Sequence, residues 1–501
     1  ARQKEMAIRA ALGAGRRRLI RQLLTESVVL SCCGAAVGVI LAVAATAVVA
    51  NLNAFNIPLL ESVRVDARVL CFTLVIAVVT GLAFGLVPAL QTPDSTVHDS
   101  LKDSNRGSTL GKRHSWIRNV LVVSEIAFAC VLLVGTGLLI RSFLRVLDVD
   151  LGFRPEHAAA LRVDPGPQYS TQARRNAYYN EALDRVKSIP GVEAAGLTDS
   201  LPLGSNRSWS AGAKGRVYSI EQPPPPAFVR IVSDGYLKAM GIGLRAGRDL
   251  SEQDTPESKP VILINQTTAR LLWPGENPIG QTLMYTDVDR EVVGVVDDVK
   301  HLALEKASGC EVYIPIRQSN DYASVDLVVR TALPPAGLAS SIRAALKPLD
   351  PNLPTNEFRT LQQIVDTAVS PRRFAVTLLS GFAGFALILA SLGIYGVVSY
   401  SVSQRTQEIG IRMALGASAR DLQGRIILQT LRLSAIGISL GVAVSWVLSR
   451  SISGLLFGVA PTDPATFLGV LVILSLVAAV AGYVPSRRAS RIEPTAALRA
   501  C

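Results

Sequence analysis

The chain has 501 residues, of which 49% are hydrophobic and only 18% are charged, and its mean hydropathy is positive. Soluble domains carry about a quarter charged residues, so the composition excludes an ordinary soluble protein and favours a membrane protein. The net charge of +12 raises the possibility of nucleic-acid binding, which the positions of the basic residues must decide.

The chain opens with a short amphipathic segment, RQKEMAIRAALGA. An acid and a base lie four residues apart in the acid-first order, a pair worth roughly 0.3–0.5 kcal/mol on a helix surface. Two apolar residues form a stripe at helical spacing and a glycine offers a turn, so we predict a helix within residues 2–24. Its key positions are Glu5, Ile8, Arg9, Leu12 and Gly13. Because the chain starts without Met and inside this unit, we interpret it as a fragment lacking its natural N-terminus.

Six apolar runs are long enough to cross a bilayer as helices, since about 20 residues at about 1.5 Å rise cover its roughly 30 Å core. Buried helices of a large soluble core are the alternative, but such helices are usually shorter and keep a polar face. The six predicted spans are residues 27–50, 69–90, 119–141, 374–399, 428–449 and 466–484.

The basic residues predict the orientation of these spans. Seven Lys and Arg lie in residues 1–24, five in 91–118, four in 404–425 and four in 486–501, whereas loops 51–68 and 450–465 hold two and one. Both ends of the chain are therefore expected in the cytosol of a bacterium, with the spans in its inner membrane. The positive charge is explained by topology, and we expect no nucleic-acid partner.

Residues 142–373, between the third and fourth spans, have the texture of a folded α+β domain on the side opposite the cytosol. Short alternating or β-branched runs indicate strands at 227–232, 260–264, 291–296 and 325–329. Helical patterns occupy residues 172–188, 267–272, 335–346 and 360–369. The fold class predicted is thus a polytopic α-helical membrane protein with six spans and an extracytoplasmic α+β domain.

The membrane part is internally duplicated. The opening segment recurs 403 residues later as RTQEIGIRMALGA, whose matching positions are Glu408, Ile411, Arg412, Leu415 and Gly416. The register continues into the next span, where Gly34 and Gly38 recur as Gly437 and Gly441, the small-xxx-small spacing that allows close helix packing. After the following loop the offset becomes 397, and the matches are Asp66 with Asp463, Gly85 with Gly482, Pro88 with Pro485 and Leu101 with Leu498.

The repeated amphipathic segment, residues 2–24 and 404–425, allows two interpretations. It can be a surface anchor that holds neighbouring spans in place. It can also be a docking helix pressed against a cytosolic partner, which the detail kept in both copies favours.

Three motifs carry a resemblance to a known family: IGIRMALGAS at 409–418, LLFGVAPTDPATF at 455–467 and VPSRRASRIEPTAALR at 484–499. They resemble the C-terminal signature of MacB/FtsX-type ABC transporter permeases, and residues from Arg118 onward resemble the MacB-like periplasmic core domain. The duplication is similar to that of the acidobacterial-type duplicated permeases, with residues 1–118 as the last part of a first unit and residues 374–501 as the second FtsX-like domain.

The resemblance implies a mechanism. In this family the segment between the second and third spans of a unit is a coupling helix that docks on an ABC ATPase, and nucleotide-driven closure of the ATPase moves the spans and the outer domain. It implies an ATPase partner for each repeated segment, a pseudo-dimer within the full-length chain or a homodimer, and an optional periplasmic or outer-membrane partner.

Chemistry within the chain itself is not expected. GSTLGK at 107–112 is one residue short of a phosphate-binding loop, so any ATPase is a separate chain and no cofactor is expected. The four histidines lack metal-ligand spacing, and His301 is interpreted as a surface residue. Asp297 and Asp298 are expected to be solvated and to point apart. Glu125, inside the third span, is either structural or functional. Six scattered cysteines predict no structural disulfide.

Two functions stay open. The first is a permease that couples ATP hydrolysis by a separate ATPase to efflux or mechanotransmission. The second is a non-transporting membrane scaffold or signalling module that regulates envelope proteins.

Overall fold

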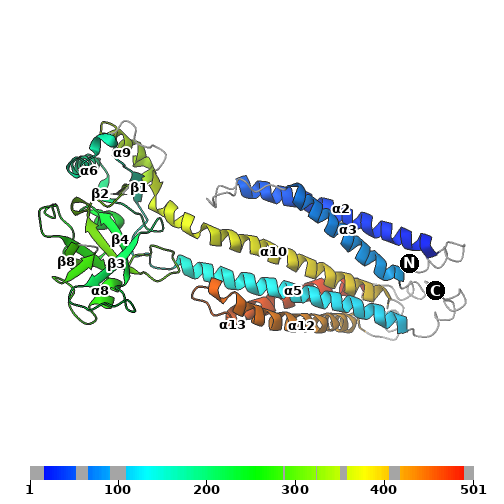
Figure 1. Ribbon diagram of the computed structural model, residues 1–501. Helices are drawn as coiled ribbons and strands as arrows, with labels where there is room; N and C mark the ends of the chain where they lie inside the picture. Colours follow the sequence, from blue (N-terminus) through cyan, green and yellow to red (C-terminus); the bar gives the residue numbers. More distant parts are fainter. Residues whose placement is uncertain are drawn as a thin grey trace, which may run out of the picture. The chain divides into compact units, whose positions relative to one another are not determined.

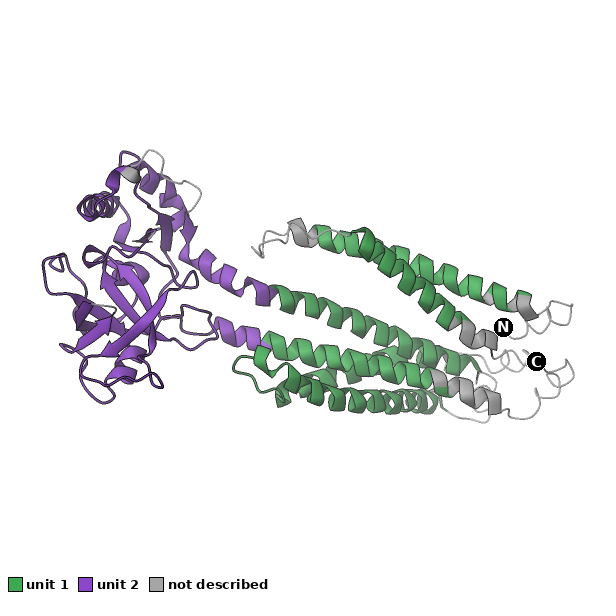
Figure 2. Ribbon diagram, viewed as in Figure 1, with its two compact units in different colours: residues 1–140, 374–501 green, residues 141–373 purple. Residues whose placement is uncertain are grey.

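The computed structural model describes residues 16–51, 66–90, 109–285, 288–322, 324–349, 358–404 and 418–489. The chain divides into two compact units: residues 1–140 together with 374–501 form the helical unit, and residues 141–373 form the outer domain (Figures 1 and 2). This division lies within one residue of the domain bounds drawn from the sequence.

Six long helices make up the helical unit and the first residues of its connections to the outer domain. They are α2 (Arg16–Asn51), α3 (Ala67–Leu90), α5 (Thr109–Leu147), α10 (Leu361–Gln404), α12 (Ala419–Ser451) and α13 (Pro464–Ala489). Five of them are long and apolar enough to cross a membrane, fewer than the six spans predicted. The remaining span falls in α3, where the apolar stretch among the residues with described side chains, Ala67–Ala83, is shorter.

Helices α5, α10, α12 and α13 share one apolar core. Buried residues from all four meet in a single cluster, for example Ile126, Ile394, Ile438 and Leu474. Polar contacts reinforce it: the Thr136 hydroxyl of α5 donates to a backbone carbonyl of α10 at 3.2 Å. Since lipid is as apolar as these side chains, close packing and such bonds hold a membrane bundle together.

The two copies of the repeat share the start of their last helix. The Asp66 carboxylate accepts the Val69 backbone N–H at 2.9 Å before α3, and the Asp463 carboxylate accepts the Thr466 N–H at 2.9 Å before α13. Both are N-cap bonds that satisfy an otherwise unpaired N–H. The aspartate match read from the sequence therefore reflects one capping interaction, built twice.

A glycine contact is also built twice. In α3, a Cβ added at Gly85 would lie 3.2 Å from the Ser27 hydroxyl of α2, and in α13 one added at Gly482 would lie 3.2 Å from the Thr430 hydroxyl of α12. Ser27 and Thr430 occupy the same position of the repeat, as do the two glycines. The pairs α2–α3 and α12–α13 are therefore equivalent in contacts as well as in sequence.

The outer domain is built on one sheet of eleven strands, part of which closes on itself. The strand path runs β4-β3-β7-β8-β6-β9, and β9 returns to pair in parallel with β4, so these six strands form a small barrel. The sheet continues from β4 through β2, β10 and β1 to β11, with β5 on β8. Closure removes open edges from the barrel part. The strands are β1 (Ala158–Arg162), β2 (Val192–Thr198), β3 (Ser208–Ala213), β4 (Pro226–Val232), β5 (Leu244–Gly247), β6 (Val261–Asn265), β7 (Thr282–Tyr285), β8 (Val288–Val296), β9 (Cys310–Pro315), β10 (Asp326–Thr331) and β11 (Arg359–Thr360).

Short helices cover this sheet. The amphipathic helix α6 packs its buried residues, Tyr178, Tyr179 and Leu183 among them, into the core that the strands share. The helices are α6 (Gln172–Lys187), α7 (Tyr236–Met240), α8 (Gln266–Leu272) and α9 (Ala339–Leu346), with 3-10 turns at Pro167–Tyr169, Ile316–Gln318 and Pro335–Leu338.

The four strands and three of the four helices predicted in this region are confirmed by β4, β6, β8 and β10 and by α6, α8 and α9. The fourth helical prediction, 360–369, was wrong in its limits. That segment is the beginning of α10, because no turn signal separates it from the apolar run that follows.

Candidate functional site

Helix α5 lies against α12 through two glycines. A Cβ added at Gly437 would lie 2.9 Å from the Ile126 Cβ, and one added at Gly441 would lie 2.5 Å from the Cys130 Cβ and 2.9 Å from the Ala127 carbonyl oxygen. The approach is therefore closer than any larger residue allows. For Gly34 and Gly38, the structure shows no such neighbour among its described residues. A packing role for these two glycines stays a prediction.

Glu125 faces α10 rather than open lipid. It is partly buried, and a Cβ added at Gly393 of α10 would overlap its carboxylate. Glycine at 393 thus leaves the space that the carboxylate occupies. An acid held between two helices in a span is costly and typical of a functional or positioning group.

Helices α5 and α10 each contain the division between the two units, at residues 140/141 and 373/374. Inside the outer domain, the chain just after α5 and the outer part of α10 meet the same segment, residues 297–306, here called the junction loop. The Lys300 N–H donates to the Leu151 carbonyl at 3.0 Å, and Arg372 of α10 pairs with Glu305 at 2.9 Å. Gly152, with a φ of 73°, has no room for a Cβ beside the Asp298 carbonyl. One loop therefore receives both chain crossings.

Helix α10 has a proline at the point where it approaches the division. Pro371 has no N–H to donate to the carbonyl of Thr367, four residues earlier. The Ser370 hydroxyl donates to that carbonyl instead, at 2.8 Å. The helix therefore continues through Pro371 with its freed carbonyl satisfied.

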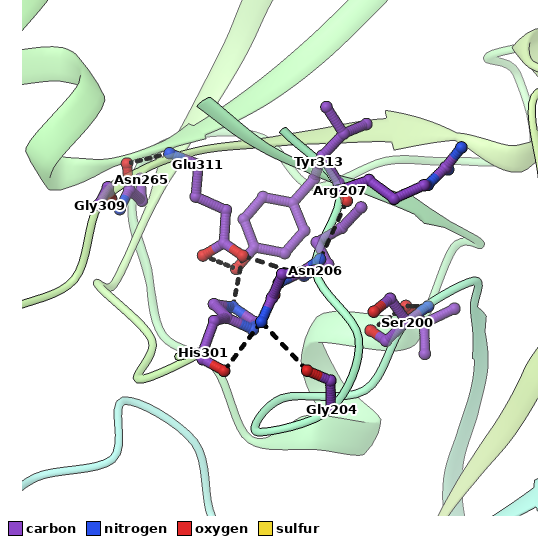
Figure 3. A network of polar contacts seen from close by, with 12 residues as sticks. Ser200, Gly204, Asn206, Arg207, Asn265, His301, Gly309, Glu311 and Tyr313 are labelled. Carbon is purple, nitrogen blue, oxygen red and sulfur yellow. Dashed lines mark hydrogen bonds and ion pairs between the residues drawn. The ribbon is translucent and has the colours of Figure 1, made fainter. Parts of the chain in front are cut away.

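The junction loop inserts His301 into a buried network of charged and polar side chains (Figure 3). Arg230 of β4 is 0% exposed and pairs with Glu311 of β9, 1% exposed, with 3.2 Å between Arg230 Nε and Glu311 Oε1. His301 Nε2 contacts the same carboxylate oxygen, and the Tyr313 hydroxyl donates to the other at 2.9 Å. Asn206 accepts from Arg230 and donates to the His301 carbonyl at 3.2 Å. The network fixes the junction loop to two strands of the barrel.

A second buried carboxylate flanks this network. Asp199 accepts the Ile231 N–H at 2.8 Å and a guanidinium N–H of Arg207. Burial raises the pKa of Asp199 above its usual range, more than these bonds lower it. Both ends of β4 are thus tied by buried charge.

The structure corrects the expectation for His301 and refines the one for the two aspartates. His301 is buried rather than on the surface, because its loop folds back over the open side of the barrel strands. Asp297 pairs with Arg245 and Gln266, whereas Asp298 accepts the Thr267 N–H at 2.8 Å and pairs with Arg270. They point to different partners, as expected, but both are engaged rather than simply solvated.

Sequence reasoning missed Arg230 and Glu311. A signal was present: each is a charged residue inside an apolar strand run, AFVRIV and CEVYIP. A charge at an inward strand position requires a buried partner of opposite sign. The two are 81 positions apart, so the sequence does not pair them.

The ATPase-coupling residues predicted from the sequence all lie outside the described residues. They are Glu5, Ile8, Arg9, Leu12, Gly13, Glu408, Ile411, Arg412, Leu415 and Gly416. Within the described residues, no group of three or more His, Cys, Asp or Glu side chains has the arrangement of a metal site.

We expect the outer domain to lose stability as the pH falls below about 6.5, the ordinary pKa of histidine. Burial lowers the pKa of His301, as does Arg230, and Glu311 opposes this only in part. The unfolded chain therefore binds a proton that the folded chain resists, so stability is full above the unfolded pKa and declines below it. The measurement is amide hydrogen exchange of β9 in the full chain across pH 5–8. His301→Gln is expected to reduce the slope, and an unchanged slope would contradict the assignment.

Comparison with known proteins identifies the family. A model of the FtsX-like permease C-terminal domain matches residues 1–92 and again 380–494, the two copies of the repeat. A model of the MacB-like periplasmic core domain matches residues 120–348. The chain belongs to the MacB/FtsX-type ABC transporter permeases. Its apolar helices and its outer domain are the parts that define such a permease, so it is a multi-pass membrane protein.

Named relatives of this permease are export proteins. A "Probable syringafactin export ATP-binding/permease protein" of Pseudomonas syringae pv. tomato is 28% identical over 287 residues, covering 53% of this chain and 41% of the relative. The macrolide export ATP-binding/permease protein MacB of Azoarcus sp. is 27% identical over 264 residues, covering 50% and 39%. The ABC transporter permease YknZ of Bacillus subtilis is 23% identical over 323 residues, covering 63% and 78%. The chain spans less than half the length of the first two.

Among solved structures, the periplasmic region of MacB from Actinobacillus actinomycetemcomitans is 16% identical, with a TM-score of 0.31. The match covers 44% of this permease and 97% of that structure.

Proposed function

We propose that this chain is the permease part of an ABC transporter, in which a separate ATPase drives movement of the outer domain for export or mechanotransmission. The observation that carries the proposal is the junction loop: it bonds the chain after α5 through Leu151 and α10 through Arg372. A shift of either helix therefore acts directly on the loop, and through His301 on the buried network.

The proposal places residues 1–24 and 404–425 in the cytosol as two ATPase-docking segments and residues 142–373 outside the inner membrane. This orientation is supported by the excess of Lys and Arg in the cytosolic stretches. Two docking segments fit two ATPase subunits on a pseudo-symmetric permease. The relatives are named for different cargoes, macrolides and syringafactin, so no particular substrate follows.

We expect the double substitution Arg9→Glu and Arg412→Glu to abolish co-purification of an ABC ATPase with the full chain from membranes. Each change reverses one charge of an acid–base pair in a docking segment and places like charges four residues apart. The measurement is affinity purification followed by mass spectrometry and ATPase assay of the eluate. Lys102→Glu, a charge reversal in the predicted cytosolic linker, is the matched control and should retain the ATPase.

The opposite outcome has a definite meaning. If the unaltered chain brings down no ATPase, or if the double variant retains it in full, the coupling role is wrong. The non-transporting scaffold would then be the better description of the protein.

A further inference from the structure

Helix α5 rests in the groove between α12 and α13, not on α12 alone. Besides Gly437 and Gly441 of α12, Thr466 of α13 contacts it: a Cβ added at Gly137 of α5 would lie 2.7 Å from the Thr466 methyl group. Ser445, one turn beyond Gly441, is 3% exposed, and its side chain hydrogen-bonds the Cys130 thiol of α5. Four positions on two helices thus form one seat for α5.

The equivalent seat on α2 and α3 is exposed in the described structure. The repeat maps Gly437, Gly441, Ser445 and Thr466 onto Gly34, Gly38, Ala42 and Val69. All four of the latter are exposed; Val69 is 51% exposed, whereas Thr466 is 7% exposed. Because both helix pairs share the same cap and the same glycine contact, the difference does not come from a different pair geometry. It comes from the helix that α12–α13 hold and α2–α3 do not hold within the described residues.

We infer that the face of α2 and α3 formed by Gly34, Gly38, Ala42 and Val69 is a docking seat for a further transmembrane helix with the contact pattern of α5. That pattern is a ridge of small and β-branched side chains at helical spacing, represented in α5 by Val123, Ile126, Ala127 and Cys130. Glycines at four-residue spacing accept such a ridge by close backbone approach. The inference rests on the internal repeat and does not depend on the ATPase.

The occupant is a helix outside these 501 residues rather than a second copy of the chain. In each copy, the Ile126–Cys130 face of α5 is already covered by its own α12. A second copy would have to give up that buried contact to fill the seat of its neighbour. A separate α5-like helix fills it without such a loss.

The test uses the full chain in membranes and, as a probe, a synthetic helix of residues 116–147 with its natural Cys130. The chain carries Ala42→Cys as its single thiol, all six natural cysteines having been replaced by alanine. Mild oxidation is expected to join chain and probe by a disulfide, because Ala42 holds the position at which Ser445 meets Cys130. Gly38→Leu in the same chain should reduce this yield at least tenfold by blocking the seat.

Two controls make every outcome decisive. Ser445→Cys in a chain that keeps only its own Cys130 should form an internal disulfide, which shows that the chemistry reports this contact. If that control works and the probe is not captured by the Ala42→Cys chain, the seat does not exist. If a chain with Ala42→Cys and its own Cys130 instead forms disulfide-linked chain dimers that the probe does not suppress, the occupant is a second copy and the inference is wrong. Neither failure would bear on ATPase co-purification.

Discussion

Replacing Arg230 by methionine is expected to lower the free energy of unfolding of the outer domain by about 3–5 kcal/mol. The substitution removes the cation that faces Glu311 and leaves a fully buried carboxylate beside a histidine whose protonation is opposed by burial. An uncompensated charge in the interior is among the most costly single changes in a protein. The loss should appear as faster hydrogen exchange of β4 and β9 amides in the full chain in urea.

The matched control removes both charges. Arg230→Met combined with Glu311→Gln should recover a large part of the loss, since no ion remains buried without its partner, although the Tyr313 hydroxyl keeps only an amide acceptor. A loss below about 1 kcal/mol for the single variant, or no recovery in the double variant, would show that the network contributes little to holding β4 and β9 together.

The second large effect concerns the membrane bundle, where Gly441→Leu is expected to separate α12 from α5. The first added carbon already lies 2.5 Å from Cys130 Cβ and 2.9 Å from the Ala127 carbonyl, and the latter is backbone that cannot rotate away. Overpacking of this kind typically costs about 1–3 kcal/mol. The measurement is the free energy of unfolding of the full chain in mixed detergent micelles.

Gly424→Leu on the same helix is the control, because an added Cβ there meets nothing within 4 Å among the described residues. It should leave the unfolding free energy within about 0.5 kcal/mol of the parent. Equal losses for the two variants would mean that the effect comes from helix propensity rather than from the contact with α5.

Much of the architecture could be predicted from local patterns. Hydropathy located the long helices, and alternation of β-branched residues located β4, β6, β8 and β10, because both signals arise within one element. The duplication predicted the equivalence of Asp66 with Asp463, which the capping bonds explain. The closure of the barrel through β4 and β9 could not be predicted, since it depends on a parallel pairing between strands about 80 residues apart along the chain.

The candidate site was less accessible to sequence reasoning for the same reason. Glu125 stood out because a charge within a span is rare, but its neighbour Gly393 follows 268 residues later. His301 was misread because nothing near it in the chain is apolar enough to announce burial. Its surroundings come from Arg230 and Glu311, on strands that only the fold brings together.

The replacement of a backbone donor by the Ser370 hydroxyl has a mechanical consequence for α10. An ordinary helix resists sharp bending because each turn is held by its own N–H donors, whose bonds stretch on the outer side of the curve. At Pro371 that donor is missing, and a rotatable hydroxyl can follow its acceptor as the axis tilts. A tilt of the inner part of α10 is therefore absorbed most cheaply one residue before Arg372, so the angle of the stroke changes there while the grip on Glu305 is kept.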